Sequence, residues 1–245
     1  MKAPAVGPWQ AVRSALVGTK DVVWGLQPFL KLTPRNIPIL GLVGFAISYL
    51  LCQKHMLPLP VSAVVSKMAF LPTFTITALS RRGNYWTEID DTVVLGCAPF
   101  DFAVGHPKKL YHLGVRGVVN MCAEYTGPVD AYANLGIRQL RLPTTDHFES
   151  SVEQLEDAVA FIDQHRERGE RVYVHCKAGH GRAAAVVLSD MIKQNPHMPP
   201  IALNAALFGR RKVRKTLYKQ SNVLRFIERL GASDENWNTA SKKSQ

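Results

Sequence analysis

One short segment, residues 172–187, holds residue types that could do chemistry on an anion. It reads VYVHCKAGHGRAAAVV, with a cysteine, two glycines and an arginine between two apolar runs. The first run predicts a strand, the small residues a turn, and Ala-Ala-Ala-Val-Val a helix. Such a turn directs backbone N–H groups at one point beside the positive end of the new helix. The segment therefore predicts an anion site with Cys176 at its entrance and Arg182 at its far side.

Nucleophilic attack on a phosphate ester requires residues of these types. A thiolate is the nucleophilic form of cysteine, and a helix N-terminus and Arg182 should both favour it at Cys176. Glycines let the backbone approach the ligand, and a guanidinium can hold equatorial phosphate oxygens. Cys176 would displace the leaving alkoxide and form a phosphocysteine, which water then hydrolyses. The expected phosphate-binding residues are Lys177, Ala178, Gly179, His180, Gly181 and Arg182.

The cysteine content excludes some other classes of site. Four cysteines in 245 residues, without paired spacing, predict neither a disulfide framework nor a zinc site. Cys52, Cys97 and Cys122 are predicted to be small buried apolar residues, which indicates a reducing compartment. The chemistry expected at Cys176 needs no metal or other cofactor, and no metal-ligand spacing is present.

The elements around the loop predict an α/β fold. Strand-like runs alternate with helical patterns, which indicates a central, mostly parallel sheet flanked by helices. Ser151 and Gln154 have capping-box spacing, so they predict the start of a long helix. The predicted strands are 92–96, 115–121, 137–142 and 172–175, and the later helices are 183–194, 201–209 and 219–230.

The N-terminal part is basic and apolar. Residues 1–87 hold nine Lys or Arg and one acid, a net charge of +8, whereas residues 88–245 carry only +3 of the total of +11. Basic charge beside apolar sequence favours an anionic membrane over nucleic acid, because no base-stacking aromatic series accompanies it. Residues 36–53 are free of charge and form a candidate transmembrane segment, since a span needs about 20 apolar residues. Residues 1–35 suit a mitochondrial presequence or a positive cytoplasmic flank, two alternatives that stay open.

A second apolar stretch, LPLPVSAVVSKMAFLPTFTITAL, is interrupted by prolines and Lys67. It is more typical of an interfacial or re-entrant segment, and the alternative is a buried helical hairpin packed on the domain. We expect three parts: a membrane-associated region at 1–80, a catalytic domain at 81–232 and a disordered tail at 233–245.

The loop HCKAGHGR resembles the signature of the cysteine-dependent phosphatases, the dual-specificity branch in particular. By this resemblance, Lys177 and the basic His180 imply a substrate with a highly charged phosphate or a lipid phosphate. The alternative is that both side chains are solvated charges of the loop. Further segments resemble the mitochondrial phosphatidylglycerophosphate phosphatases in order and spacing. These segments are TVVLGCAPF, GVRGVVNMCAEY and LGIRQLRLPTTD. The similarity covers about residues 84–230 and implies the dual-specificity phosphatase fold.

That family uses an aspartate as general acid, and Asp146 falls at the matching position. Protonation of an alkoxide leaving group commonly contributes about 10²–10⁴-fold in rate. The alternative role of Asp146 is a turn residue or helix cap, and Asp130 and Glu149 are further candidates for the acid. The resemblance also implies that His175 hydrogen-bonds within the loop.

Two stretches depart from the family pattern. Residues 123–126 read AEYT where the family tends to show EEYE, and Ala183 stands where it usually has Ser or Thr. The first weakens the lipid assignment. The second removes a hydroxyl that would hydrogen-bond to the departing Cys176 thiolate, so it predicts slow hydrolysis of the phosphocysteine. The basic run 209–215 could hold lipid headgroups or form a solvated turn.

The function expected is hydrolysis of a phosphomonoester on an acidic phospholipid, phosphatidylglycerophosphate, at a membrane. Two alternatives stay open: a dual-specificity protein phosphatase and a non-catalytic phosphate-binding adaptor. The expected location is the mitochondrial inner membrane, with the endoplasmic reticulum or another intracellular membrane as the alternative.

Overall fold

A computed structural model describes residues 36–102 and 104–231. It divides the chain into two compact units, Met1–Leu50 and Leu51–Gln245. Helix α3 (Leu59–Ser80) packs through Phe70 and Phe74 against Ala98 of the catalytic part, so the boundary expected at 80/81 falls inside the second unit. The predicted presequence and the predicted C-terminal tail lie outside the described residues.

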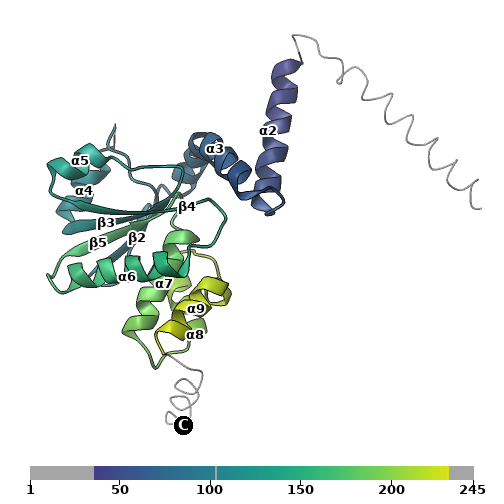
Figure 1. Cartoon of the computed structure of the whole chain (residues 1–245). Coiled ribbons are helices and arrows are strands. Elements are labelled where there is room, and N and C mark those ends of the chain that lie inside the picture. The colour runs from purple at the N-terminus through teal and green to yellow at the C-terminus, as the bar shows by residue number, and fades with distance from the viewer. Residues whose placement is uncertain (1–35, 103, 232–245) are drawn as a thin grey trace, which may run out of the picture. The chain divides into compact units, whose positions relative to one another are not determined.

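A five-stranded sheet forms the centre of the second unit (Figure 1). Its order is β1-β2-β5-β3-β4, and only the β1–β2 pair is antiparallel. This arrangement confirms the α/β class with a mostly parallel sheet. The strands are β1 (Trp86–Glu88), β2 (Val93–Gly96), β3 (Val115–Cys122), β4 (Arg138–Thr144) and β5 (Arg171–His175).

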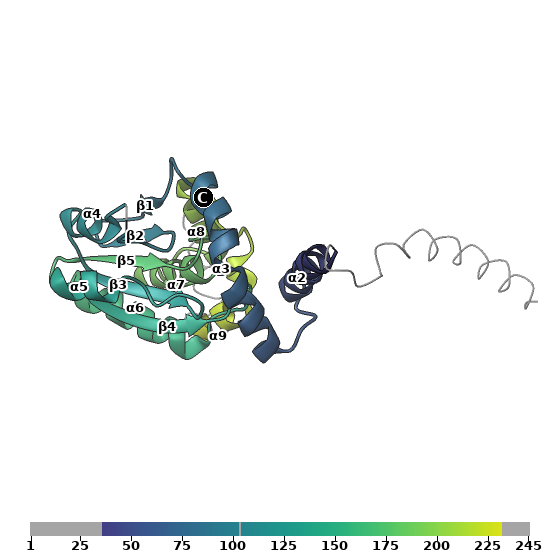
Figure 2. The ribbon, with the colours of Figure 1, turned by 90° about the horizontal axis from the view of Figure 1, so that it is seen from above.

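Helices cover both faces of the sheet (Figure 2). One face carries the larger apolar core, to which α6 (Val152–Arg166), α7 (Arg182–Gln194), α8 (Pro200–Arg210) and α9 (Ser221–Arg229) contribute. On the other face lie α4 (His106–His112) and α5 (Val129–Asn134), over a smaller core. The long predicted helices are confirmed, whereas α4, α5 and β1 were missed.

The capping box predicted for the long helix is present. The Ser151 side chain accepts from the Gln154 backbone N–H at 3.2 Å, and Gln154 Oε1 accepts from the Ser151 N–H at 3.0 Å. This reciprocal pair fixes the start of α6 and so the end of the preceding loop, which carries Asp146.

The parallel strands direct four loops to one edge of the sheet. The loops after β2, β3, β4 and β5 all leave the carboxyl ends of their strands, because these four strands run in the same direction. Ligands of open α/β sheets bind at this edge. Cys97, Glu124, Asp146 and Cys176 each lie on one of these loops.

The two apolar stretches are both helical. Helix α2 (Ile37–Gln53) has 17 residues. Among the described residues, α3, with 22 residues, is the one helix long and apolar enough to cross a membrane. One third of the apolar window in α3 is buried, so most of that window is exposed. Its inner face packs on the catalytic part, while its outer face exposes large apolar side chains, which are Leu59, Val61, Val64, Met68, Leu71, Ile76 and Leu79.

Candidate active site

The loop of residues 176–181 joins β5 to α7 at the carboxyl edge of the sheet. β5 lies between β2 and β3, so the loop starts near the middle of the sheet. Cys176 is 3% exposed and His175 is fully buried. Gly181 is the N-cap of α7, and Arg182 is its first residue. The strand, turn and helix predicted for this segment are confirmed.

The carbonyl groups of the loop are held from outside. Those of Lys177 and His180 accept from the backbone N–H groups of Ala98 and Arg214, at 3.2 and 3.0 Å. That of Ala178 accepts from the Cys97 thiol at 3.4 Å. A trans peptide places its N–H opposite its C=O, so carbonyls directed outward leave N–H groups directed into the pocket. The loop thus has the form of an anion cradle.

Gly179 is required by the shape of the loop. Its φ is +62°, and a Cβ there would lie 2.5 Å from the carbonyl oxygen of Gly96. Both the left-handed conformation and the close approach exclude a larger residue. Gly179 therefore allows the loop to pass tightly over the end of β2.

Arg211 lies behind the loop and was not predicted to be part of the site. Its side chain is 1% exposed, and its guanidinium donates to the carbonyls of Gly179 and Ala178, both at 3.2 Å. Further bonds tie it to the carbonyls of Asn84 and Tyr85. Arg211 belongs to the basic run 209–215, for which lipid-headgroup binding or a solvated turn was expected. Neither role applies to Arg211, because its buried side chain fastens the catalytic loop to the start of β1.

Arg182 is held by a carboxylate from another loop. Its guanidinium makes two parallel bonds to Glu124, at 2.8 and 2.7 Å, and a third to the Thr144 carbonyl at 2.7 Å. The Glu124 side chain is 1% exposed. A bidentate pair of this kind fixes the plane of the guanidinium. Glu124 is thus a site residue that the sequence analysis quoted without giving it a role.

Asp146 lies between two cations. Its Oδ1 accepts from Arg182 Nη2 at 2.8 Å, and its Oδ2 pairs with Lys177 Nζ. Burial raises the pKa of Asp146, but Arg182 and Lys177 outweigh it and hold the pKa well below its usual range. Asp146 is therefore a carboxylate in the ligand-free site. Glu149, a further candidate for the acid, instead accepts from the Asn222 N–H at 3.4 Å.

Basic side chains surround the pocket entrance. Arg81 donates to the carbonyl of Lys212 at 2.9 Å, and the same carbonyl lies 3.1 Å from His180 Nδ1. Arg214 lies 3.8 Å from the position of a Cβ on Gly181. Burial lowers the pKa of His180, and the neighbouring cations lower it further although its bond to Lys212 opposes them. His180 therefore lines the entrance as a neutral ring.

The arrangement favours an exchange of anions at Arg182. Glu124 and the Thr144 carbonyl hold one side of the guanidinium, while Asp146 occupies a single bond on Nη2. A phosphate group can replace that single bond without disturbing Glu124. Once displaced from Arg182, Asp146 keeps Lys177 but loses the stronger of the two cationic effects on its pKa and lies beside the phosphate charge, so that pKa rises and the carboxyl group can carry a proton.

A comparison with known protein families shows to which class of protein this chain belongs. The family model for the dual specificity phosphatase catalytic domain matches residues 102–226, and the chain belongs to this family. The resemblance drawn from the sequence is thereby confirmed.

Two relatives with similar sequences belong to one group of these phosphatases. Phosphatidylglycerophosphate phosphatase PTPMT2 of Arabidopsis thaliana is 34% identical over 134 residues, which cover 52% of this chain and 58% of the relative. Phosphatidylglycerophosphatase and protein-tyrosine phosphatase 1 of Rattus norvegicus is 30% identical over 155 residues, 58% of this chain and 79% of the relative. The match spans less than two thirds of the plant relative.

A solved structure supports the fold. The crystal structure of PTPMT1 superposes with a TM-score of 0.52 and 27% identity, over 61% of this chain and 100% of that one. The dual-specificity phosphatase fold expected from the sequence is confirmed.

Proposed function

We propose that this protein hydrolyses the phosphomonoester of an acidic phospholipid, phosphatidylglycerophosphate, through a phosphocysteine intermediate. The observation that carries the proposal is the convergence of Cys176, Arg182 and Asp146 on one cradle of backbone N–H groups. Cys176 is the nucleophile, Arg182 holds the phosphate, and Asp146 protonates the leaving alkoxide. The phosphate-binding loop comprises Lys177, Ala178, Gly179, His180, Gly181 and Arg182.

The order of events follows from the ligand-free contacts. The phosphate enters, takes the place of Asp146 on Arg182 and makes further bonds with the loop N–H groups. Asp146, released from Arg182, takes up a proton from solvent. As the Cys176 thiolate bonds to phosphorus, the bond from phosphorus to the leaving oxygen breaks, and Asp146 gives its proton to that oxygen. The same carboxylate then removes a proton from the water that attacks the phosphocysteine.

Two observations support a lipid substrate. Both relatives described above carry phosphatidylglycerophosphate phosphatase activity in their names. Helix α3 also borders the pocket, because Thr73 Oγ1 lies 3.3 Å from Lys177 Nζ. An apolar helix and a basic entrance at the same pocket suit a substrate with acyl chains and an anionic headgroup.

A second candidate is a phosphoprotein phosphatase with the same machinery. The name of the rat relative includes protein-tyrosine phosphatase, which is the observation that favours it. A panel of phosphatidylglycerophosphate, phosphoinositides and phosphotyrosine peptides, offered to the full-length chain in detergent micelles, separates the two. We expect phosphate release from the lipid at the highest kcat/KM.

The same panel tests the covalent step. Cys176→Ser should abolish phosphate release and leave phosphate binding largely intact, because the loop N–H groups and Arg182 remain. Turnover by this variant would contradict the phosphocysteine mechanism. No turnover by the unaltered chain on any substrate would favour the non-catalytic adaptor.

We also propose attachment to a membrane, the mitochondrial inner membrane, through residues 36–80. Helix α2 is 17 residues long, about 26 Å at 1.5 Å per residue, and α3 is 22 residues long, about 33 Å. The full-length chain should stay with membranes after an alkaline carbonate wash. Release by high salt alone would instead indicate surface binding through basic charge, which salt screens.

A further inference from the structure

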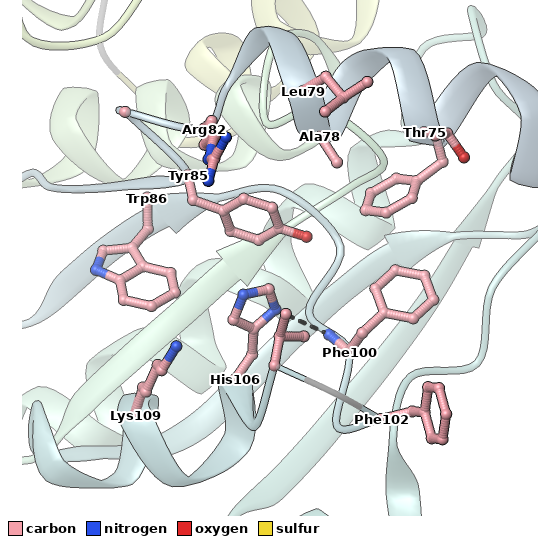
Figure 3. Close-up of a pocket in the computed structure, with 13 residues that line it drawn as sticks. Thr75, Ala78, Leu79, Arg82, Tyr85, Trp86, Phe100, Phe102, His106 and Lys109 are labelled. Carbon is pink, nitrogen blue, oxygen red and sulfur yellow. Dashed lines mark hydrogen bonds between the residues drawn. The ribbon is translucent and has the colours of Figure 1, made fainter.

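A recess lies beside the last turns of α3 (Figure 3), and no residue of the catalytic loop lines it. It has a volume of about 1050 Å³. Its walls come from α3, from β1 and the turn before it, from the segment between β2 and α4, and from α4 itself. The recess is large enough to hold part of a small amphiphile.

The two ends of the recess differ in character. Trp86, Arg82 and Lys109 lie toward one end, while Phe100, Phe102 and Thr75 lie toward the other (Figure 3). Phe102 is 92% exposed, an unusual position for a phenylalanine that covers nothing. The recess therefore offers a cationic end and an aromatic end.

The polar atoms of the wall are already satisfied. Tyr85 Oη donates to the carbonyl of Ala98 at 2.5 Å, and His106 Nδ1 accepts from the Phe100 N–H at 3.1 Å. Burial lowers the pKa of His106 to about 4, so its ring is neutral near pH 7. Arg82 and Lys109 are thus the charges of the recess, and none of its lining residues is acidic.

Helix α3 separates this recess from the catalytic pocket. On one flank, Thr73 contacts Lys177; on the other, Ala78 lines the recess. Beneath the helix, the backbone of Ala98 bonds to the Lys177 carbonyl, while its own carbonyl accepts from Tyr85. None of the residues that line the recess belongs to the catalytic loop, so a second molecule can occupy the recess while the substrate phosphate lies at Cys176.

The surroundings specify the chemistry of that molecule. The recess opens beside the exposed apolar face of α3, and residues 22–87 contain no Asp or Glu. The Thr75 hydroxyl on that face donates to the Leu71 carbonyl of its own helix at 3.0 Å, so it does not need water. An exposed acid, Asp101, lies between Phe100 and Phe102 in the sequence but does not line the recess. A lining without acids that holds two cations, next to the apolar face of α3, is complementary to an anionic lipid.

We propose that the recess binds one acyl chain of an acidic phospholipid that is not the substrate. The chain lies against Phe100 and Phe102, and Arg82 and Lys109 hold the headgroup phosphate beside the indole of Trp86. Indole rings are enriched at this depth of a membrane. The site would hold the enzyme on acidic membranes independently of which ester is hydrolysed at Cys176.

Quenching of Trp86 fluorescence tests the proposal on the full-length chain. Two sets of vesicles have the same ratio of phosphatidylcholine to phosphatidylglycerol, with brominated acyl chains on the phosphatidylglycerol in one set and on the phosphatidylcholine in the other. Trp86→Phe measures the signal of the other tryptophans, Trp9, Trp24 and Trp237, for subtraction. We expect the Trp86 signal to be quenched more strongly by brominated phosphatidylglycerol, after correction for its share of the lipid.

Charge reversal supplies the matched variants. Lys109→Glu should weaken the preference for brominated phosphatidylglycerol by more than about fivefold, since loss of one basic residue alone costs about that factor on an anionic surface and the added carboxylate repels the headgroup. Lys108→Glu is the control, because Lys108 is exposed on the same helix and does not line the recess. Phe102→Asp places a charge at the aromatic end and should remove the preference, and its thermal midpoint shows that the variant is folded.

Three outcomes would overturn the proposal. Equal corrected quenching by both lipids would mean that Trp86 is immersed in the bilayer without selecting a lipid. No quenching in either set would mean that something other than lipid covers the recess, such as a second copy of the chain. Equal losses in Lys109→Glu and Lys108→Glu would mean that surface charge alone attracts the membrane.

Discussion

The loop that carries Cys176 and the loop that carries Asp146 reach the same pocket but are held differently. The first is fastened through its backbone carbonyls to Ala98, Arg211 and Arg214. The side chain of Asp146 is held by Arg182 and Lys177, the groups that should bind the phosphate. The cradle is therefore built before substrate arrives, whereas the contacts of the acid must exchange when it does.

The largest effect expected from this difference is in Asp146→Asn. The amide cannot supply a proton, so hydrolysis of alkyl phosphates should slow by about 10²–10⁴-fold, and hydrolysis of aryl phosphates much less. Because the amide pairs more weakly with Arg182, the variant should also bind inorganic phosphate at least as tightly as the unaltered chain. Rates measured with matched alkyl and aryl esters check this prediction. Equal slowing of both would show that Asp146 is structural.

A comparison of the two carboxylates on Arg182 gives the second prediction. Removing one partner of a buried ion pair costs about 3–5 kcal/mol, and Glu124 holds Arg182 by two bonds. Asp146 still pairs with Arg182 in Glu124→Gln, so the cost should be at the lower end of that range, about 3 kcal/mol. This cost lowers the thermal midpoint of the variant by about 6–12 °C. Asp146→Asn breaks contacts that substrate also breaks, and should lower the midpoint less. Equal shifts measured by calorimetry would remove the distinction between a fixed and an exchangeable partner.

The sequence predicts the features that depend on local patterns and misses those that depend on contacts between distant residues. The strands and long helices were predicted because their apolar periodicity is local, and Cys176 and Arg182 share one short segment. Glu124 and Arg211 were not predicted as site residues, because they lie 58 and 32 positions from Arg182 and Gly179. The pairing of Glu124 with Arg182 depends on β3 lying beside β5, and the contact of Arg211 depends on the chain returning to the catalytic loop after α8. The sequence states neither arrangement. The elements α4 and α5, of seven and six residues, are too short for periodicity to define.

The third prediction concerns Ala183, which follows Arg182 and is fully buried. A hydroxyl there would donate to the Cys176 sulfur as it leaves phosphocysteine, a bond of about 1.5–3 kcal/mol when the acceptor is charged. Ala183→Ser should therefore raise kcat by about 10- to 100-fold with little change in kcat/KM. The unaltered chain should show a burst of leaving group that the variant loses.

Ala184→Ser is the control for this prediction, because Ala184 is equally buried one residue further along α7. It should leave the burst unchanged. An unaltered kcat in Ala183→Ser would show that the cradle already stabilises the thiolate, and the rigid loop would then account for both chemical steps.

The smallest effect expected, taken over a single pH unit, is a pH dependence that separates the two loops. Burial lowers the pKa of His175, at the start of the cradle, to about 3. Its ordinary pKa is 6.5, so below that pH the unfolded chain binds a proton that the folded chain does not. The free energy of unfolding should therefore fall as the pH decreases, by about 1.4 kcal/mol per pH unit between about 6 and 3.

The pKa of Asp146 is also lowered, below the ordinary 3.8, but for a carboxyl group this downward shift stabilises the folded chain. Its stabilising contribution is complete above that value and is lost only in stronger acid. Unfolding followed between pH 6 and pH 4.5 thus reports the histidines whose pKa is lowered, His175 and His106 among them, and not Asp146. Phe lacks a titrating group, so His175→Phe should reduce the slope in this interval by about 1.4 kcal/mol per pH unit, while Asp146→Asn should leave it unchanged. A slope that is unchanged in His175→Phe would assign the acid sensitivity to the other histidines, of which His106 is the first to test.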